Sequence, residues 1–129
     1  MNGMFFDTPF NGDISLWDVS NVTDMGNMFS NSKFIGDISA WDVSNVNNMG
    51  WMFMNSKFNN DISNWDVSQV SETRNIFFSC PIDKNYKPTK FRKLLEGFDF
   101  DSTNKDKKLI NVHDVLHSQI KNIVDKIVV

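Results

Sequence analysis

The sequence predicts an α/β repeat solenoid, with a short parallel β ladder and one short helical turn in each 24-residue repeat, followed by a C-terminal helical cap. Three observations predict this fold. A Phe opens each of three near-identical blocks, at Phe10, Phe34 and Phe58, so the period is 24 residues. Each block carries the run Trp-Asp-Val-Ser, whose alternation is typical of a short strand. After residue 81 the period is lost and the apolar spacing becomes helical.

The register divides the chain into a repeat region and a C-terminal part. Residues 1–9 match the second half of a block, so we interpret them as a half repeat. The complete repeats span residues 10–33, 34–57 and 58–81, and residues 82–129 form the predicted cap. A unit of this size cannot bury its apolar side alone, so neighbouring repeats must stack to make a continuous core.

Within each repeat, the sequence predicts a strand and then a helical turn. Residues 17–19 alternate inward and outward as a strand does, and their counterparts in the next repeats are expected beside them at about 4.8 Å. The tryptophans of this ladder, Trp17, Trp41 and Trp65, are predicted to line up in the core. Further along, Met25 and Phe29 have the i, i+4 spacing of one helical face.

The C-terminal part predicts two helices. The first begins near Pro88 and runs for about ten residues, with Phe91, Leu94, Leu95 and Phe98 on one face. The second is capped by Asn111 and carries an apolar stripe that continues to Val128. Because a repeat array needs a cover at its end, we expect the second helix to close the C-terminal end of the array; otherwise it pairs with a partner helix.

The repeated run Phe-Asn-Gly-Asp-Ile-Ser, then Trp-Asp-Val-Ser-Asn-Val-Thr-Asp-Met and Met-Phe, resembles the BspA-like repeats of bacterial surface proteins. These repeats also occur in mycoplasma-type lipoproteins and are related to leucine-rich repeats. The resemblance covers residues 10–77 and implies a leucine-rich-repeat-like solenoid, often displayed on the cell surface and engaged in adhesion or protein recognition. It brings no catalytic residues. Neither a signal peptide nor a lipobox is visible, so the sequence leaves the compartment open.

Composition excludes several classes of protein. The chain has 13 basic and 16 acidic side chains and a single Cys, so no internal disulfide holds it together. No apolar run approaches the roughly 20 residues that span a bilayer, and we expect no membrane insertion. The net charge of −3 argues against a nucleic-acid binder, which carries a strongly basic face.

Charge is divided unevenly along the chain. Residues 1–81 hold three basic and nine acidic side chains, whereas residues 82–129 hold ten basic and seven acidic ones. Either the two parts simply differ in composition, or the basic part docks on the acidic repeats or on an acidic partner.

Stacking would place carboxylates in two columns, which are Asp13, Asp37 and Asp61, and Asp18, Asp42 and Asp66. Such columns are compatible with calcium, but we favour the interpretation that each Asp accepts hydrogen bonds within its own turn. A calcium loop at residues 99–106 and a metal pair at His113 and His117 have little support, because further ligands are missing. Cys80 has no neighbouring base that would activate it. We therefore expect no metal, no cofactor and no catalytic residue, and the chain is not predicted to be an enzyme.

Apolar residues at positions that vary between repeats mark a candidate interface: Phe6, Leu16, Trp51, Met54 and Phe78. Trp51 and Met54 are three apart on the predicted helical turn and should share an outward face, where Phe78 and Phe6 could extend an exposed patch. The alternative is that the C-terminal part covers them.

These residues predict a noncatalytic protein-recognition or adhesion module, or alternatively a structural subunit of a particle or envelope. We expect a protein partner or self-association and no small-molecule ligand. The array begins with half a repeat, so the edge of the first predicted strand, at residues 14–19, is expected to pair with a partner or symmetry mate, unless the array is longer.

Overall fold

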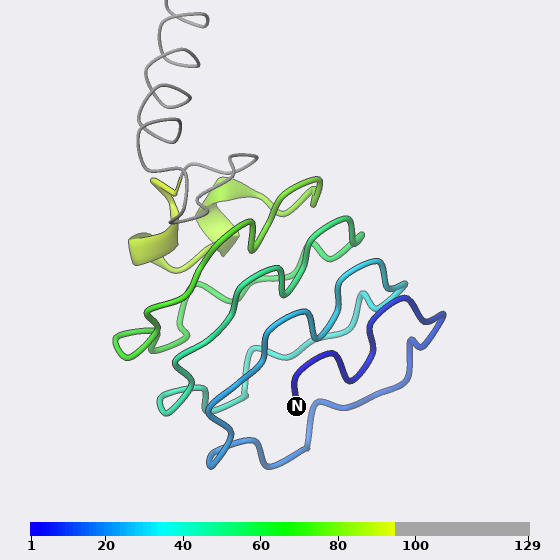
Figure 1. Ribbon diagram of the computed structural model, residues 1–129, viewed down its shortest axis with the longest axis horizontal. Coiled ribbons are helices and arrows are strands. Elements are labelled where there is room, and N and C mark those ends of the chain that lie inside the picture. Colours follow the sequence, from blue (N-terminus) through cyan, green and yellow to red (C-terminus); the bar gives the residue numbers. More distant parts are fainter. Residues whose placement is uncertain (95–129) are drawn as a thin grey trace, which may run out of the picture. The chain divides into compact units, whose positions relative to one another are not determined.

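The computed structural model describes residues 1–94 of the chain. The chain divides into two compact units, Met1–Glu96 and Gly97–Val129, and the described residues all belong to the first. In this unit the backbone winds through successive coils that run side by side in the same direction (Figure 1). Each coil has a stacked segment on one side and a turn segment on the other. The stacked segments are residues 1–8, 25–32, 49–56 and 73–80, and the turn segments are residues 10–23, 34–47 and 58–71.

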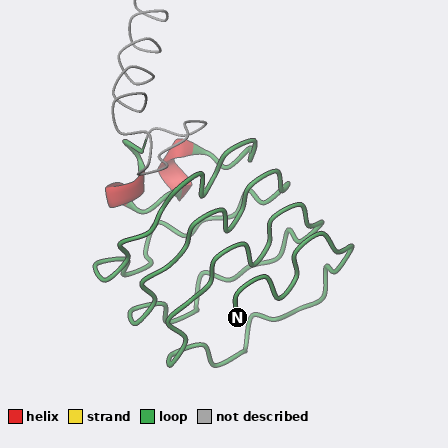
Figure 2. Cartoon of the chain, in the orientation of Figure 1, coloured by secondary structure: helices red, strands yellow, loops and turns green. Residues whose placement is uncertain are grey.

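The predicted α/β solenoid with a β ladder is wrong. Residues 1–94 contain no strand and no α-helix, and their regular elements are two 3-10 helices, η1 (Lys84–Tyr86) and η2 (Thr89–Phe91) (Figure 2). Two isolated parallel bridges, Asp24 with Asn48 and Asn48 with Glu72, are the β pairing found in this part of the chain. The leucine-rich-repeat-like architecture that the resemblance implies is therefore absent from the described residues.

The predicted strand fails because its residues hydrogen-bond locally. Asp18 accepts hydrogen bonds at Oδ1 from the backbone N–H of Ser20 at 3.0 Å and from its hydroxyl at 2.6 Å. The backbone N–H of Trp17 donates to the carbonyl of Ile14 at 3.1 Å, which closes a turn just before this one. Asp and Ser side chains offer the backbone this alternative to a sheet, and the N–H groups of Trp17 and Ser20 are thereby used within the turns.

The predicted helical turn fails because two positions in each stacked segment have a left-handed backbone. The residues with positive φ recur at the same two register positions: Gly3, Asp7, Asn27, Asn31, Trp51, Asn55, Asn75 and Ser79. A right-handed helix cannot pass through such positions, whereas Gly, Asn and Asp tolerate them well. The left-handed residues turn alternate N–H groups toward the neighbouring coil instead of along the segment.

Hydrogen bonds between stacked segments hold successive coils together. The N–H groups of Met25 and Phe29 donate to the carbonyls of Asn48 and Met52, both at 2.8 Å. The same pattern recurs at the next junction, where Phe53 donates to Ile76 at 2.9 Å. Within these segments every such bond runs from an N–H of one coil to a carbonyl of the following coil, so the stack has a direction.

Two columns of phenylalanine form the centre of the core. Phe5, Phe29, Phe53 and Phe77 stack with ring centroids 5.7, 5.5 and 5.8 Å apart. Phe10, Phe34 and Phe58 form the second column, at 6.4 and 6.3 Å. The columns also touch each other, as Phe29 and Phe34 do at 4.6 Å. Met and Ile side chains at the equivalent positions of each coil complete this core.

The three tryptophans at the equivalent position of each coil differ in burial. Trp41 and Trp65 are buried, and the indole N–H of each donates to an Ile carbonyl of the preceding coil, at 3.0 and 3.1 Å. Trp17 lies in the first coil and remains 41% exposed. The prediction of a buried Trp position therefore holds for the two inner coils and not for the first.

Residues 82–94 lie against the last coil. Phe91 is buried and contacts the ring of Phe77, with centroids 6.3 Å apart. The ammonium of Lys90 donates to the carbonyls of Val67 at 3.2 Å and Val70 at 2.9 Å. The predicted ten-residue helix from Pro88 is wrong over the described residues, because the 3-10 helix η2 ends at Phe91 and residues 92–94 are not helical. The later part of this predicted helix and the predicted helix after Asn111 lie outside the described residues.

The left-handed positions can be tested by substitution at Asn27. Asn27→Ala keeps the backbone N–H but removes the short polar side chain that makes a left-handed backbone tolerable at φ 55. The free energy of unfolding should therefore fall by about 1 kcal/mol. Asn27→Gly should change it by only a few tenths of a kcal/mol, since glycine accepts this backbone freely. Urea unfolding of the three proteins measures the difference. Equal stability of the Ala and Gly variants would contradict the left-handed assignment.

Candidate functional site

Trp51 occupies a backbone position that does not suit it. Its φ is 57, and the same register position holds Gly3, Asn27 and Asn75 in the other coils. A bulky residue at positive φ is an outlier that costs about 1–2 kcal/mol relative to a right-handed conformation. Strain of this kind is typical of residues that are kept for their side chains.

The Trp51 side chain is half-buried and lies beside Arg74 of the next coil. The guanidinium carbon of Arg74 is 5.5 Å from the centroid of the indole ring, in a cation–π arrangement. The backbone holds the two residues in place, because the N–H of Trp51 donates to the carbonyl of Arg74 at 2.8 Å. The N–H of Arg74 in turn donates to Oε2 of Glu72 at 2.7 Å.

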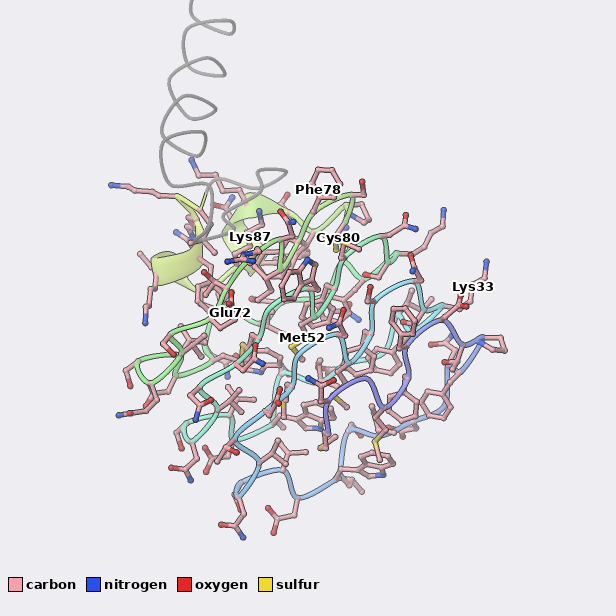
Figure 3. The ribbon with its side chains drawn as sticks, viewed as in Figure 1. Lys33, Met52, Glu72, Phe78, Cys80 and Lys87 are labelled. Atoms are coloured by element: carbon pink, nitrogen blue, oxygen red, sulfur yellow. The ribbon has the colours of Figure 1, made fainter. Side chains whose placement is uncertain are left out.

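Met54 and Phe78 belong to the same two stacked segments as this pair. The N–H of Met54 donates to the carbonyl of Trp51 at 3.2 Å, which closes a turn. Phe78 occupies the register position of Met54 in the following coil, and 43% of its surface is exposed. Figure 3 shows Phe78 at the outer edge of the stack, whereas Met52 lies inside it. We call Trp51, Met54, Arg74 and Phe78 the Trp51 patch.

The structure separates the other two candidate residues from this patch. Phe6 shares a register column with Met54 and Phe78, but the buried Ser30 lies between Phe6 and Met54 in that column. Leu16 belongs to a turn segment on the other side of the coil and is 94% exposed. Its counterparts Ala40 and Asn64 are exposed as well. Because neither is a large apolar residue, Leu16 does not extend into an apolar column along the turns.

Sequence reasoning missed Arg74. It is one of three basic residues among residues 1–81, which is a signal that could have found it. Its register counterparts are Asn2, Gly26 and Gly50, so the backbone does not require a long side chain at this position. A Cβ at Gly50 would approach Cγ of Glu72 to 3.0 Å, which shows how little room the inner coils leave there.

The Asp columns serve the turns, as the sequence predicted. Asp13, Asp37 and Asp61 each accept the N–H of the Ser two residues later at 2.9 Å, and Asp18, Asp42 and Asp66 do so at 3.0 Å. Hydrogen bonds from the partner Ser hold the pKa of all six carboxyls below the usual value. The Ser side chain has the largest effect on five of them, and the backbone N–H of Ser39 has the largest effect on Asp37. The hydroxyl of Ser44 lowers the pKa of Asp42 most, followed by the N–H of Ser44. These two effects outweigh the negative charges of Asp66 and Asp18, which raise the pKa.

Two open grooves follow these turns. The larger has a volume of about 460 Å³ and is lined by Asp37, Ser39, Asn60, Asp61, Ser63, Asn64 and Tyr86. The donor atoms of its amides already serve the scaffold, since Asn60 Nδ2 donates to the carbonyl of Ile35 at 2.6 Å and Asn64 Nδ2 to that of Ser39 at 3.2 Å. In the described part, no group of three His, Cys, Asp or Glu side chains is arranged to hold a metal ion.

Of the remaining sequence candidates, Cys80 lies among the described residues. Cys80 is half-buried, and its Sγ lies 3.2 Å from the carbonyl oxygen of Phe58. The suspected calcium loop at residues 99–106 and the pair His113 and His117 lie outside the described residues. Across residues 1–94, no helix is long and apolar enough to cross a membrane.

A family model described as "Mycoplasma protein of unknown function, DUF285" matches residues 1–123 of the chain. No curated protein and no solved structure matches the chain. The family match supplies no activity, and it leaves the assignment to BspA-like repeats unconfirmed.

The Asp turns predict acid sensitivity. A carboxyl whose pKa is lowered on folding contributes stability above its unfolded pKa, and this contribution is lost as the pH falls toward the folded pKa. The urea midpoint should therefore fall as the pH drops below about 4. Replacing Asp18, Asp42 and Asp66 with Asn keeps an acceptor for each Ser N–H, so this variant should lose less stability between pH 5 and pH 2.5.

The matched control replaces the same three Asp residues with Ala, which removes the acceptor. This variant should be destabilised even at pH 7, because the Ser N–H groups lose their partners. An Asn variant with the full acid sensitivity of the parent would contradict the role assigned to these carboxylates.

Proposed function

We propose that this chain, which belongs to the family of Mycoplasma proteins of unknown function called DUF285, is a noncatalytic module that recognises another protein. The observation that carries the proposal is the backbone of Trp51, at φ 57 where the other coils have Gly or Asn. The strain does not serve the stack, since Asn27 donates the equivalent inter-coil hydrogen bond without a bulky side chain. A recognition role for the indole accounts for its presence.

The composition of the Trp51 patch supports binding of a protein. Trp and Arg are enriched among residues that dominate interface energies, and Met and Phe are also enriched at interfaces. The contact between the Arg74 guanidinium and the Trp51 ring already restricts both side chains, so less side-chain freedom remains to be lost on binding. The exposed ring of Phe78 adds apolar surface in the next coil.

The carboxylates support a noncatalytic role. Acid–base work by paired carboxyls needs two unlike environments, one that keeps a proton and one that does not. Here all six Asp side chains have the same kind of Ser partner and the same direction of pKa shift. They act as turn residues of the scaffold.

The narrower proposal is that the chain is a BspA-like surface repeat and that its recognition role is adhesion. The three in-register blocks from Phe10 to Phe77 support this proposal, because the run of residues that carries the resemblance recurs in each of them. The irregular, turn-rich coil described above replaces the leucine-rich-repeat architecture in this proposal.

Trp51→Asn tests the function. Relief of the backbone strain offsets the lost contact with Arg74, so the free energy of unfolding should stay within about 1 kcal/mol of the parent. Binding should be lost. The measurement compares the proteins that the immobilised parent and variant retain from a cell-surface extract. Ile35→Asn is the control, since Ile35 is also apolar and exposed but lies on a turn segment.

The outcomes separate the candidate functions. A protein retained by the parent and by Ile35→Asn, and lost with Trp51→Asn, supports recognition through the Trp51 patch. If all three proteins retain the same set, the patch does not recognise a partner. A loss of more than about 2 kcal/mol in Trp51→Asn would instead show that the indole packs within the chain's own core, and would contradict an interface at this patch.

A further inference from the structure

The larger of the two grooves on the turn side contains three residues that depart from the repeat. Both grooves hold Asp and Ser residues of the same register columns, so these residues do not distinguish them. Asn60, by contrast, stands at a position that is Gly in both preceding coils, and the counterparts of Asn64 are Leu16 and Ala40. The third departure is Tyr86, and all three side chains line the larger groove. We call it the Tyr86 groove.

The exposed ring of Tyr86 replaces a side chain that the repeat buries. Residues 82–86 continue the 24-residue register, because the N–H of Asp83 donates to Oδ1 of Asn59 at 2.8 Å. The equivalent bond joins the turns of the first two repeats at 2.9 Å. Tyr86 is therefore the counterpart of Ile62 and of the two isoleucines before it in this column, all of them buried. The ring of Tyr86 is 37% exposed, so the repeat does not account for it.

The groups that the Tyr86 groove offers to a ligand are mainly hydrogen-bond acceptors. The amide nitrogens of Asn60 and Asn64 already donate to backbone carbonyls, at 2.6 and 3.2 Å. Each amide therefore offers Oδ1 to a ligand. The carboxylates of Asp37 and Asp61 accept the Ser N–H of their own turns at Oδ1, so Oδ2 of each remains. A ligand that pairs these oxygens must bring several donors close together.

The charges around the Tyr86 groove favour a neutral ligand. Its two carboxylates oppose an anion. Hydrogen bonds from Ser63 lower the pKa of Asp61 most, and the positive charge of Arg92 lowers it further, so this cation acts at the groove. Residues 82–94, which contribute Tyr86, hold five basic side chains and one acidic one. These positive charges oppose a cationic ligand, whereas a neutral ligand is opposed by neither set.

We propose that the Tyr86 groove binds a neutral sugar residue of a glycan, with the ring of Tyr86 against one face of the sugar. The hydroxyl groups of a sugar are adjacent donors, which match the amide and carboxylate oxygens. Hydrogen bonds from hydroxyls to carboxylates are short and strong. An extended peptide fits less well, because each of its residues brings only one backbone N–H together with a carbonyl. The volume of about 460 Å³ lies within the range of roughly 300–1,000 Å³ that is typical of ligand sites.

An oligosaccharide array tests the proposal. The full chain is applied to immobilised oligosaccharides that end in neutral hexoses or N-acetylhexosamines, beside sialylated and sulfated versions of the same oligosaccharides. We expect binding to neutral oligosaccharides and weaker binding to the charged versions. Calorimetric titration then measures the affinity for the neutral oligosaccharide that binds best. The Tyr86 groove shares no residue with the Trp51 patch and its proposal does not rest on protein recognition, so Trp51→Asn should bind this oligosaccharide like the parent.

Substitutions in the groove locate the site. Asn64→Ala removes an acceptor and installs the residue type of Ala40, so the affinity should fall about two- to tenfold while the fold is kept. Tyr86→Ala removes the ring and should weaken binding at least roughly tenfold. Asp61→Asn keeps an acceptor for its turn but removes the charge, and should also weaken binding. The matched control is Asp13→Asn, the same change in the smaller groove, which should leave the affinity unchanged.

Urea unfolding establishes that each variant is folded, and Asn64→Ala and Asp61→Asn keep the test valid if Tyr86→Ala unfolds. Weakened binding by these folded variants, with full affinity in Asp13→Asn, supports the proposal. Failure of the parent to bind any neutral oligosaccharide, or equal or tighter binding to the charged versions, would overturn it. Unchanged affinity in folded Asn64→Ala and Asp61→Asn, or an equal loss in Asp13→Asn or Trp51→Asn, would also overturn it, because the sugar would then lie elsewhere.

Discussion

The hydrogen bond from an N–H of one coil to a carbonyl of the next is the interaction on which the rest of this structure depends. It forms because two positions in every stacked segment have a left-handed backbone, which points alternate donors out of the segment. Once the coils are joined in this way, residues at the same register position lie above one another. The two phenylalanine columns, with rings 5.5–6.4 Å apart, follow from that register.

The same constraint explains why the candidate interface is where it is. A left-handed position suits Gly or Asn, so the scaffold does not require a large side chain there. Trp51 uses one such position at a cost in backbone energy, and Arg74 of the next coil supports its ring. The direction of the hydrogen bonds has a second consequence at the first coil, where no N–H among the described residues donates to the carbonyls of Asn2, Met4 and Phe6.

Much of this arrangement could be predicted from the sequence. The 24-residue period places the Phe, Met and Ile residues in the core, and the Asp and Ser pairs form turns. The strand and the helical turn were wrong, because turns linked by Asp and Ser side chains produce the same apolar spacing as regular elements. Asn27, Asn31 and Asn55 indicated the left-handed turns in the sequence, since Asn is enriched at positive φ. Trp51 was found by its departure from the repeat. Arg74 is a rare basic residue in this part of the sequence, but only the fold shows that it lies beside the indole of Trp51.

Scalar couplings across hydrogen bonds test the inter-coil connection most directly. In an isotopically labelled sample, the account predicts couplings from the amide nitrogens of Met25, Asn27 and Phe29 to the carbonyl carbons of Asn48, Gly50 and Met52, respectively. The same set should recur from Met49, Trp51 and Phe53 to Glu72, Arg74 and Ile76. Couplings from these amides to carbonyls four residues earlier would instead show an α-helical turn in each repeat, and would contradict the stack of left-handed turns described here.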